Sequence, residues 1–284
     1  MLSVTRNPRY LFFGPLTALV WSALGFHPIV FVPGEDSGWE RGRERTTLDW
    51  LRKLERERLL TVVRVPCPPK DEVFISQMVR LYGGGLPFLH NESWLVTNDI
   101  DMWPMWRDPY VMGKRDGRAL SSNAACCGKF EYRGAHFQEL PMGAVGMRAK
   151  QWRQVMRLSE PFSNVDCLVS VMRKRAEHMF GGTLTDFRGA HWRDDQHMLS
   201  VLTFTTPNVV SNMLFVGRSP GDRLDRIDWP KPSCLAQMGR QATDAHLPFP
   251  GDQYWKRDLR HLFQAVVTNT TLQRHGDDFA SAYH

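Results

Sequence analysis

The segment from Trp94 to Pro104 constrains the fold most, because an apolar run there leads directly into two aspartates one residue apart. The apolar residues predict a buried strand, Asp99 and Asp101 follow it, and Pro104 predicts its end. Residues i and i+2 of a strand point to the same side, so both carboxylates are expected to reach one spot past the strand end. Oxygen ligands held in this way suit Mg²⁺ or Mn²⁺.

Strands and helices alternate before this motif. Apolar periodicity predicts strands near 2–5, 29–32 and 60–65, and helices over 8–24, 47–60 and 71–81. This alternation is typical of an α/β fold with a mostly parallel central sheet flanked by helices. Ligands of such sheets bind beyond the carboxyl ends of the strands, where Asp99 and Asp101 are expected.

The second half of the chain has a more mixed pattern. It predicts strands near 120–127 and 142–147 and helices over 149–158, 167–180, 191–202 and 255–266. We see no internal repeat and no long linker. The sequence therefore predicts a single domain over 1–268, with halves that divide at about residue 105 (about 1–105 and 106–268). A polar C-terminal tail, 269–284, is expected to fray.

Charge and cysteine usage narrow the class of protein. The net charge is +6, but the arginines are scattered and form no dense basic tract, so we expect no nucleic-acid partner. The five cysteines form no spaced framework and no CxxC pair. Reduced, mostly buried thiols are expected, which suits a cytoplasmic protein, with a lumenal catalytic fragment as the alternative.

The stretch from Tyr10 to Gly34 has the length of a membrane span and contains no Asp, Glu, Lys or Arg. Pro15, Gly25 and Pro28 interrupt it. We therefore expect a buried helix followed by a buried strand, and no stable membrane span.

Taken in order along the chain, these motifs resemble the GT-A-fold glycosyltransferases, the nucleotide-diphospho-sugar transferases with a DxD motif. The resemblance extends over roughly Leu2 to Val266. It is carried by the strand ending at Thr5, the helix with Arg80, Thr97 to Pro104, Met142 to Met147 with Trp152, Trp192 to Gln196, and Asp244 to His246.

The resemblance implies a GT-A (Rossmann-like) fold with a nucleotide-binding half and a mixed acceptor half, and a metal site. Asp101 would ligate the divalent cation, Asp99 would contact the cation or the ribose of the donor, and His246 would complete the site. A ligand set of oxygens and an imidazole favours Mn²⁺ over Mg²⁺. A UDP-sugar donor is favoured over a GDP-sugar.

The resemblance also assigns the remaining site residues. Thr5, Asp36 and Arg80 would lie around the nucleotide and its phosphates. Asp194 and Asp195 stand where the family places the acceptor-side carboxylate, which is the general base of an inverting enzyme. This chain has Asp-Asp-Gln in place of the more usual Glu-Asp ending, so which aspartate acts stays open.

Other functions and simpler roles compete with this interpretation. A sugar-phosphate nucleotidyltransferase shares fold and metal, but Arg6 to Arg9 is a poor match to its Gly-rich loop. A non-catalytic basic module that binds glycan or nucleic acid is the third alternative. Asp194 and Asp195 also suit a solvated helix N-terminus. Arg223, Asp225 and Arg226 are expected to form a surface salt-bridge cluster, with an acceptor-side or phosphate role as the alternative.

Overall fold

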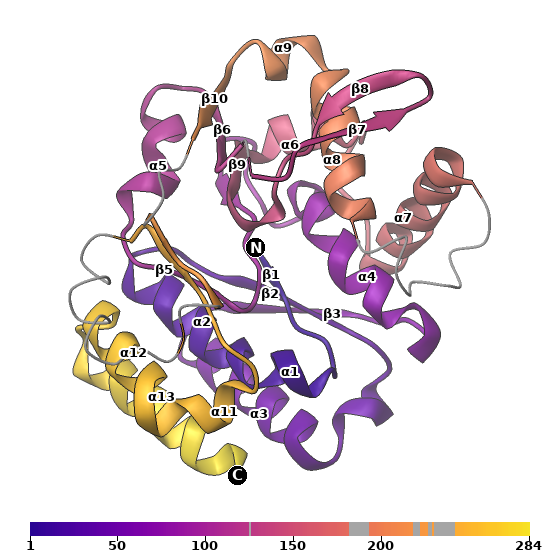
Figure 1. Cartoon of the computed structure of the whole chain (residues 1–284). Helices are drawn as coiled ribbons and strands as arrows, with labels where there is room; N and C mark the ends of the chain where they lie inside the picture. The colour runs from indigo at the N-terminus through magenta and orange to yellow at the C-terminus, as the bar shows by residue number, and fades with distance from the viewer. Residues whose placement is uncertain (125, 182–192, 218–221, 227–228, 230–241) are drawn as a thin grey trace. The chain divides into compact units, whose positions relative to one another are not determined.

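The computed structural model describes residues 1–124, 126–181, 193–217, 222–226, 229 and 242–284 (Figure 1). The chain is α/β, as the sequence predicts. It forms two compact units that are interleaved in sequence, which differs from a simple division near residue 105. Unit 1 comprises Met1, Arg64–Asn98 and Asp108–Arg218, and unit 2 comprises Leu2–Val63, Asp99–Arg107 and Ser219–His284.

The parallel sheet expected at the start of the chain is present. Its strand order is β1 (Leu2–Ser3), β2 (Ile29–Pro33) and β3 (Thr61–Val65). Strands β1 and β2 pair in parallel, with Leu2 opposite Val30. Every residue of β2 is buried, which explains its unbroken apolar sequence.

Helices of unit 2 follow the apolar periodicity of the sequence. The predicted helix 8–24 is broken after Leu11 into two helices, and Gly25 adopts φ +78° just past its end, the conformation that favours glycine. The helical elements of this unit are α1 (Pro8–Leu11), α2 (Phe13–Ala23), the 3₁₀ turn η1 (Asp36–Trp39), α3 (Gly42–Arg56), α11 (Gly251–Tyr254), the π-helical turn η6 (Trp255–Leu259), α12 (Arg260–Val266) and α13 (Thr270–Tyr283).

A second sheet of unit 2 corrects the strand predicted around the two aspartates. Its order is β11 (Arg223–Leu224), β12 (Asp244–His246) and β5 (Met102–Pro104). Asp99 and Asp101 lie in the turn before β5 and not on a strand, so the i, i+2 argument does not apply to them. Pro104 is part of β5, because an edge strand tolerates a residue without an N–H.

Unit 1 is built on a mixed sheet. Its order is β10 (Met213–Val216), β6 (Ala119–Ser122), β9 (Val145–Arg148) and β4 (Trp94–Val96). Strand β4 pairs antiparallel with β9 and so does not extend a parallel sheet. An unpredicted hairpin joins β7 (Lys129–Tyr132) to β8 (Ala135–Gln138). Its turn residues, Arg133 and Gly134, both have positive φ, which suits a tight hairpin.

The helical elements of unit 1 pack closely at Gly84. A methyl group on Gly84 would lie 2.4 Å from Cβ of Trp152, so glycine at this position allows close packing. The helical elements are η2 (Pro69–Asp71), α4 (Glu72–Met78), η3 (Val79–Gly85), α5 (Asp108–Arg115), η4 (Met142–Ala144), α6 (Ala149–Val155), α7 (Val165–Phe180), α8 (Asp194–Phe204) and α9 (Pro207–Val210).

The cysteines correct another prediction. Cys126 and Cys127 form a disulfide, so these two neighbours are not the reduced thiols that the sequence suggested. Cys67 is a buried free thiol and Cys167 an exposed one. Cys234 lies outside the described residues. Spacing rules for disulfide frameworks concern separated cysteines, and they give no signal for an adjacent pair.

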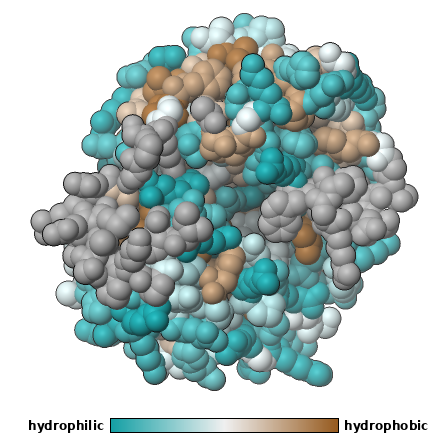
Figure 2. Space-filling model, viewed as in Figure 1, coloured by the Kyte–Doolittle hydropathy of each residue, from teal (hydrophilic) through white to brown (hydrophobic). Residues whose placement is uncertain are grey.

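The surface is largely hydrophilic on the face drawn in Figure 2, and hydrophobic residues gather at the top of the view, where Figure 1 draws β6 and β10. Phe215 on β10 is 42% exposed there. With Phe204, Ala124, Gln138 and Gly217 it lines a groove of about 330 Å³. Within the described residues, no helix has both the length and the apolar character that crossing a membrane requires.

The C-terminal residues predicted to fray form α13, whose apolar side is buried. Phe279 is 0% exposed and its ring lies 5.6 Å from that of Phe12 and 6.0 Å from that of Trp50. Helix α13 is therefore part of the core of unit 2. Its buried side includes His275 and Gly276, so strongly apolar residues alone do not mark it in the sequence.

We predict that Phe279→Ala lowers the free energy of unfolding by about 3–5 kcal/mol, because truncating a buried ring removes its contacts and leaves a cavity. Urea denaturation followed by circular dichroism measures the change. The exposed neighbour Asp278 provides the control, since Asp278→Ala should change stability by less than about 0.5 kcal/mol. Equal effects of the two substitutions would mean that the tail frays.

Candidate functional site

Asp101, Arg226 and His246 come together in unit 2. The antiparallel pairing of β5 with β12 places Met102 opposite His246, and the Leu247 N–H donates to the Asp101 carbonyl over 2.9 Å. The Arg226 guanidinium donates to Oδ2 of Asp101. Nε2 of His246 lies 3.6 Å from the same oxygen. Asp101 is only 4% exposed, so its charge depends on these partners.

The other nitrogen of the His246 ring is also occupied. Nδ1 lies 3.1 Å from Oδ1 of Asp225, and this oxygen accepts a hydrogen bond from the Nδ1–H group. Burial, reinforced by the nearby Arg226 charge, lowers the pKa of His246, so the ring is neutral at pH 7. Burial acts to raise the pKa of Asp225, but hydrogen bonds from the Arg226 N–H and from His246 outweigh it and lower this pKa. The Nδ1 proton directs the Nε2 lone pair toward Asp101.

This arrangement offers two donor atoms to a cation. Ligands bound to one ion at about 2.1 Å each lie roughly 3–4 Å apart, which matches the 3.6 Å between Nε2 of His246 and Oδ2 of Asp101. A carboxylate behind the imidazole, as Asp225 provides, is the usual support of a metal-binding histidine. Among the residues that the structure describes, however, no three His, Cys, Asp or Glu side chains are grouped closely enough to hold a metal alone. Further ligands would have to come from substrate or water.

Arg226 is held by more than Asp101. Its Nε donates to the Leu247 carbonyl over 3.0 Å, and its guanidinium lies 4.1 Å from the centre of the Phe249 ring. Burial lowers the pKa of Arg226, and the charges of Tyr10 and Asp99 oppose that effect. Asp99, half-buried, is thus within electrostatic range of the guanidinium.

A second pair of opposite charges joins β11 to β12 beside these residues. Nε of Arg223 donates to Oδ1 of Asp244 over 2.8 Å, and the Asp244 side chain is fully buried. The predicted salt bridges of Arg223, Asp225 and Arg226 are present, but their partners are buried or half-buried, so the cluster is not confined to the surface. We call Asp99, Asp101, Asp225, Arg226 and His246 the acidic–basic cluster.

Thr5 and Asp36 follow neighbouring parallel strands of unit 2. Thr5 comes two residues after β1, and Asp36 begins the 3₁₀ turn that follows β2. These two loops meet, since a methyl group on Gly38 would lie 2.1 Å from Nη1 of Arg6. The carboxyl ends of β1 and β2 therefore present Thr5, Arg6 and Asp36 at one edge of the sheet.

Arg80 lies in unit 1 and does not share the unit of Thr5 and Asp36. It is buried, and its guanidinium donates to the Asn98 carbonyl over 2.9 Å and to Oδ2 of Asp195 over 3.2 Å. The backbone N–H of Gln196 donates to the other Asp195 oxygen over 2.9 Å. Asp195 is therefore a fixed, neutralised carboxylate and not an exposed residue of a helix end.

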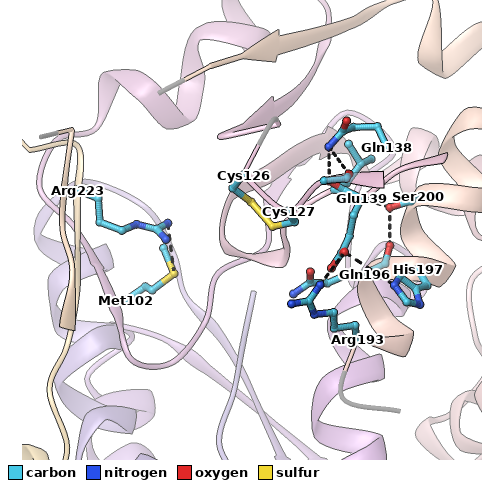
Figure 3. The surroundings of a disulfide bond; sticks show 12 residues. Met102, Cys126, Cys127, Gln138, Glu139, Arg193, Gln196, His197, Ser200 and Arg223 are labelled. Carbon is cyan, nitrogen blue, oxygen red and sulfur yellow. Dashed lines mark hydrogen bonds and ion pairs between the residues drawn. A yellow bond between two sulfur atoms is a disulfide. The ribbon is translucent and has the colours of Figure 1, made fainter. Parts of the chain in front are cut away.

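Asp194 begins α8 and is 4% exposed. One turn later His197 lies 3.9 Å from Oε2 of Glu139, and Arg193 donates to that oxygen over 3.2 Å (Figure 3). The His197 ring stacks on Phe130 with 4.0 Å between ring centres. Burial lowers the pKa of His197, while the charges of Glu139 and Asp194 act in the opposite direction. Buried charged groups therefore surround the start of α8.

The structure thus joins Asp101 to His246 and Arg80 to Asp195. Trp192, part of the motif before Asp194, lies outside the described residues. Sequence reasoning did not place Arg226 beside Asp101, and it missed Glu139. The only signal for Arg226 was its place in a charged run between apolar residues, and Glu139 had none.

Comparisons with known proteins find structural likeness but no match in sequence. No protein-family model matches the chain, and no curated protein is similar to it in sequence. Among solved structures, the glycosyltransferase GlyE of Streptococcus pneumoniae TIGR4 aligns over 99% of this chain with 10% identity and a TM-score of 0.44. This chain spans 64% of the length of that structure.

We predict that Arg80→Met destabilises the protein by about 3–5 kcal/mol, because it leaves the buried Asp195 carboxylate without its counter-charge. Urea denaturation measures the effect. Arg115→Met is the matched control, since it breaks the exposed Arg115–Asp108 pair of the same unit and should cost less than about 1 kcal/mol. A loss for Arg80→Met as small as the control would show that Arg80 has no structural role and would favour a ligand-binding one.

Proposed function

We propose that the protein transfers a sugar from a nucleotide-diphosphate donor to a hydroxyl group of a glycan, and that the acidic–basic cluster of unit 2 binds the donor diphosphate. One observation carries the proposal: Asp101 and the lone pair of His246 face each other over 3.6 Å, with an arginine on the same carboxylate oxygen. Two electron-rich atoms in this arrangement favour a positive group between them. Phosphate chemistry needs positive charge of this kind.

The charge balance of the cluster supports a phosphate ligand. As the glycosidic bond of the donor breaks, negative charge builds on the leaving diphosphate. Arg226 lies where it can donate to a phosphate oxygen while Phe249 and the Leu247 carbonyl hold it. A divalent cation, Mn²⁺ in preference to Mg²⁺, would be held by Asp101 and His246, with Asp99 nearby, and would neutralise part of the diphosphate charge.

The nucleoside of the donor is proposed to bind at the carboxyl ends of β1 and β2. Thr5 offers a hydroxyl there, and Asp36 is an exposed carboxylate suited to ribose hydroxyls. Arg6 adds a positive charge to the same edge. We favour UDP over GDP as the nucleotide.

Asp194 is proposed as the general base that takes the proton of the acceptor hydroxyl. Both oxygens of Asp195 already accept hydrogen bonds, one of them from the Arg80 guanidinium. This pairing suits Asp195 to holding the start of α8 in place. In-line attack by the activated hydroxyl would invert the configuration of the sugar.

We predict that a nucleotide-sugar raises the melting temperature only in the presence of a divalent cation. A thermal-shift panel of UDP-sugars and GDP-sugars, each with Mn²⁺, Mg²⁺ or EDTA, measures this response. Donor hydrolysis should follow the same order. Asp101→Asn and Arg226→Gln should each weaken donor binding at least about 10-fold, because each removes a charge from the diphosphate site.

Arg41→Gln is the control for these variants, since Arg41 is an exposed arginine of the same unit. It should bind donor like the wild type. Donor binding that survives both Asp101→Asn and EDTA but is lost in Arg226→Gln would contradict the cation and retain the phosphate site. No response to any nucleotide-sugar would reject the transferase proposal.

We predict further that Asp194→Asn lowers kcat by about 10²- to 10⁴-fold with little change in donor KM, as expected for loss of a general base. Steady-state kinetics with the donor identified above measure the effect. Asp116→Asn, an exposed aspartate of the same unit, should leave kcat unchanged. If Asp195→Asn lowered kcat while Asp194→Asn did not, the roles of the two aspartates would be reversed.

A further inference from the structure

Cys126 and Cys127 form a disulfide in the loop between β6 and β7 of unit 1 (Figure 3). The bond closes a small ring that contains the peptide bond between the two residues. A disulfide stabilises a protein mainly by closing a long loop of the unfolded chain, and a bond between neighbours closes almost none. Global stability is therefore a poor explanation for this bond.

We propose that Cys126–Cys127 is a thiol–disulfide exchange site whose redox state controls the backbone next to Glu139. The site would react with a thiol or dithiol reductant. Cys126 is exposed and Cys127 half-exposed, so a reductant can reach the bond. This inference does not depend on the proposed transferase activity.

The turn that holds the disulfide is fixed at both ends. At its start, the Ala124 N–H donates to the Val216 carbonyl of β10 over 3.2 Å, and the Cys126 N–H donates to the Asn123 carbonyl over 3.1 Å. At its end, the Gly128 carbonyl accepts from the Glu139 N–H over 3.0 Å and from Nε2 of Gln138 over 2.6 Å. The residue directly after the disulfide thus positions the backbone of Glu139.

Glu139 and the next residue, Leu140, contact α8 and the residue before it. The Glu139 side chain is 2% exposed, and its carboxylate accepts from Arg193, with His197 close by. The next residue, Leu140, donates its N–H to Oγ of Ser200 over 2.8 Å. A change in the turn at Gly128 would therefore be transmitted to α8 through Glu139 and Leu140, the two residues that follow β8.

Two successive thiol–disulfide exchanges reduce the bond. A reductant thiolate attacks the exposed Cys126 sulfur, forming a mixed disulfide and breaking the Cys126–Cys127 bond. Cys127 leaves as a thiolate and takes a proton from water. A second reductant thiolate then attacks the reductant sulfur of the mixed disulfide, which releases oxidised reductant and the Cys126 thiol. Two electrons pass from two reductant thiols to the protein disulfide.

Reduction should free the constrained peptide bond and weaken the pairing of Gly128 with Glu139. Two positive-φ residues, Asn123 at +58° and Gly128 at +78°, flank the pair. Asn123 is not a glycine, so it tolerates this conformation less readily than Gly128 does and is expected to leave it once the ring opens.

Alkylation and amide exchange test both parts of the proposal on the full chain. Protein purified without reductant is unfolded in iodoacetamide, and peptide mass spectrometry shows whether Cys126 and Cys127 are labelled. We expect labelling only after native protein has been treated with glutathione or dithiothreitol. Hydrogen exchange at the Glu139 amide should then become about 5-fold faster, the effect of losing one backbone hydrogen bond.

The double variant Cys126→Ser, Cys127→Ser should exchange like reduced wild type under all conditions. Cys167→Ser removes an exposed free thiol of the same unit and should keep the redox response. Labelling of both cysteines without reductant would overturn the proposal, as would a bond that native-state reductants cannot break. Unchanged exchange at Glu139 after reduction would overturn the coupling to Glu139.

Discussion

The pairing of β5 with β12 is the interaction on which the candidate donor site depends. It joins segments more than a hundred residues apart and fixes Met102 opposite His246. A slip of one residue would turn the His246 side chain to the other face of the strand. The turn before β5 is held as well, because Thr17 of α2 donates to the Ile100 carbonyl over 2.5 Å and accepts from the Trp103 indole over 2.9 Å. Core packing of unit 2 therefore sets the position of Asp101.

Buried carboxylates paired with arginine recur in both units. Asp101 pairs with Arg226 in unit 2, whereas Asp195 pairs with Arg80 in unit 1. Such pairs contribute little net stability compared with well-packed apolar residues, because removing two charges from water offsets most of their attraction. Their burial is better explained by a need for fixed charge, which is what transfer of a group from a diphosphate requires.

Local patterns in the sequence predicted the class of fold and much of unit 2. Apolar periodicity located β2, α2 and α3, and the alternation of elements indicated α/β. Apolar periodicity could not predict sheet pairing, because β4 pairs with a strand fifty residues later and runs antiparallel to it. The hairpin of β7 and β8 was missed because its strands are short and half-exposed, although Lys129 to Tyr132 alternates polar and aromatic residues. Asp101 and His246 were named from motif order, whereas Arg226 could be placed only by the pairing of distant strands.

Arg226 gives the acidic–basic cluster a property that a simple acidic site lacks. Its guanidinium has three supports, and two of them, the Phe249 ring and the Leu247 carbonyl, do not involve Asp101. If Asp101 bound another positive group, Arg226 would stay in place with donor capacity to spare, since a guanidinium carries five N–H groups. The same geometry that neutralises Asp101 would then present an arginine to an anionic oxygen. A lysine could not replace it, because an ammonium has no planar face to stack on Phe249 while donating at its edge.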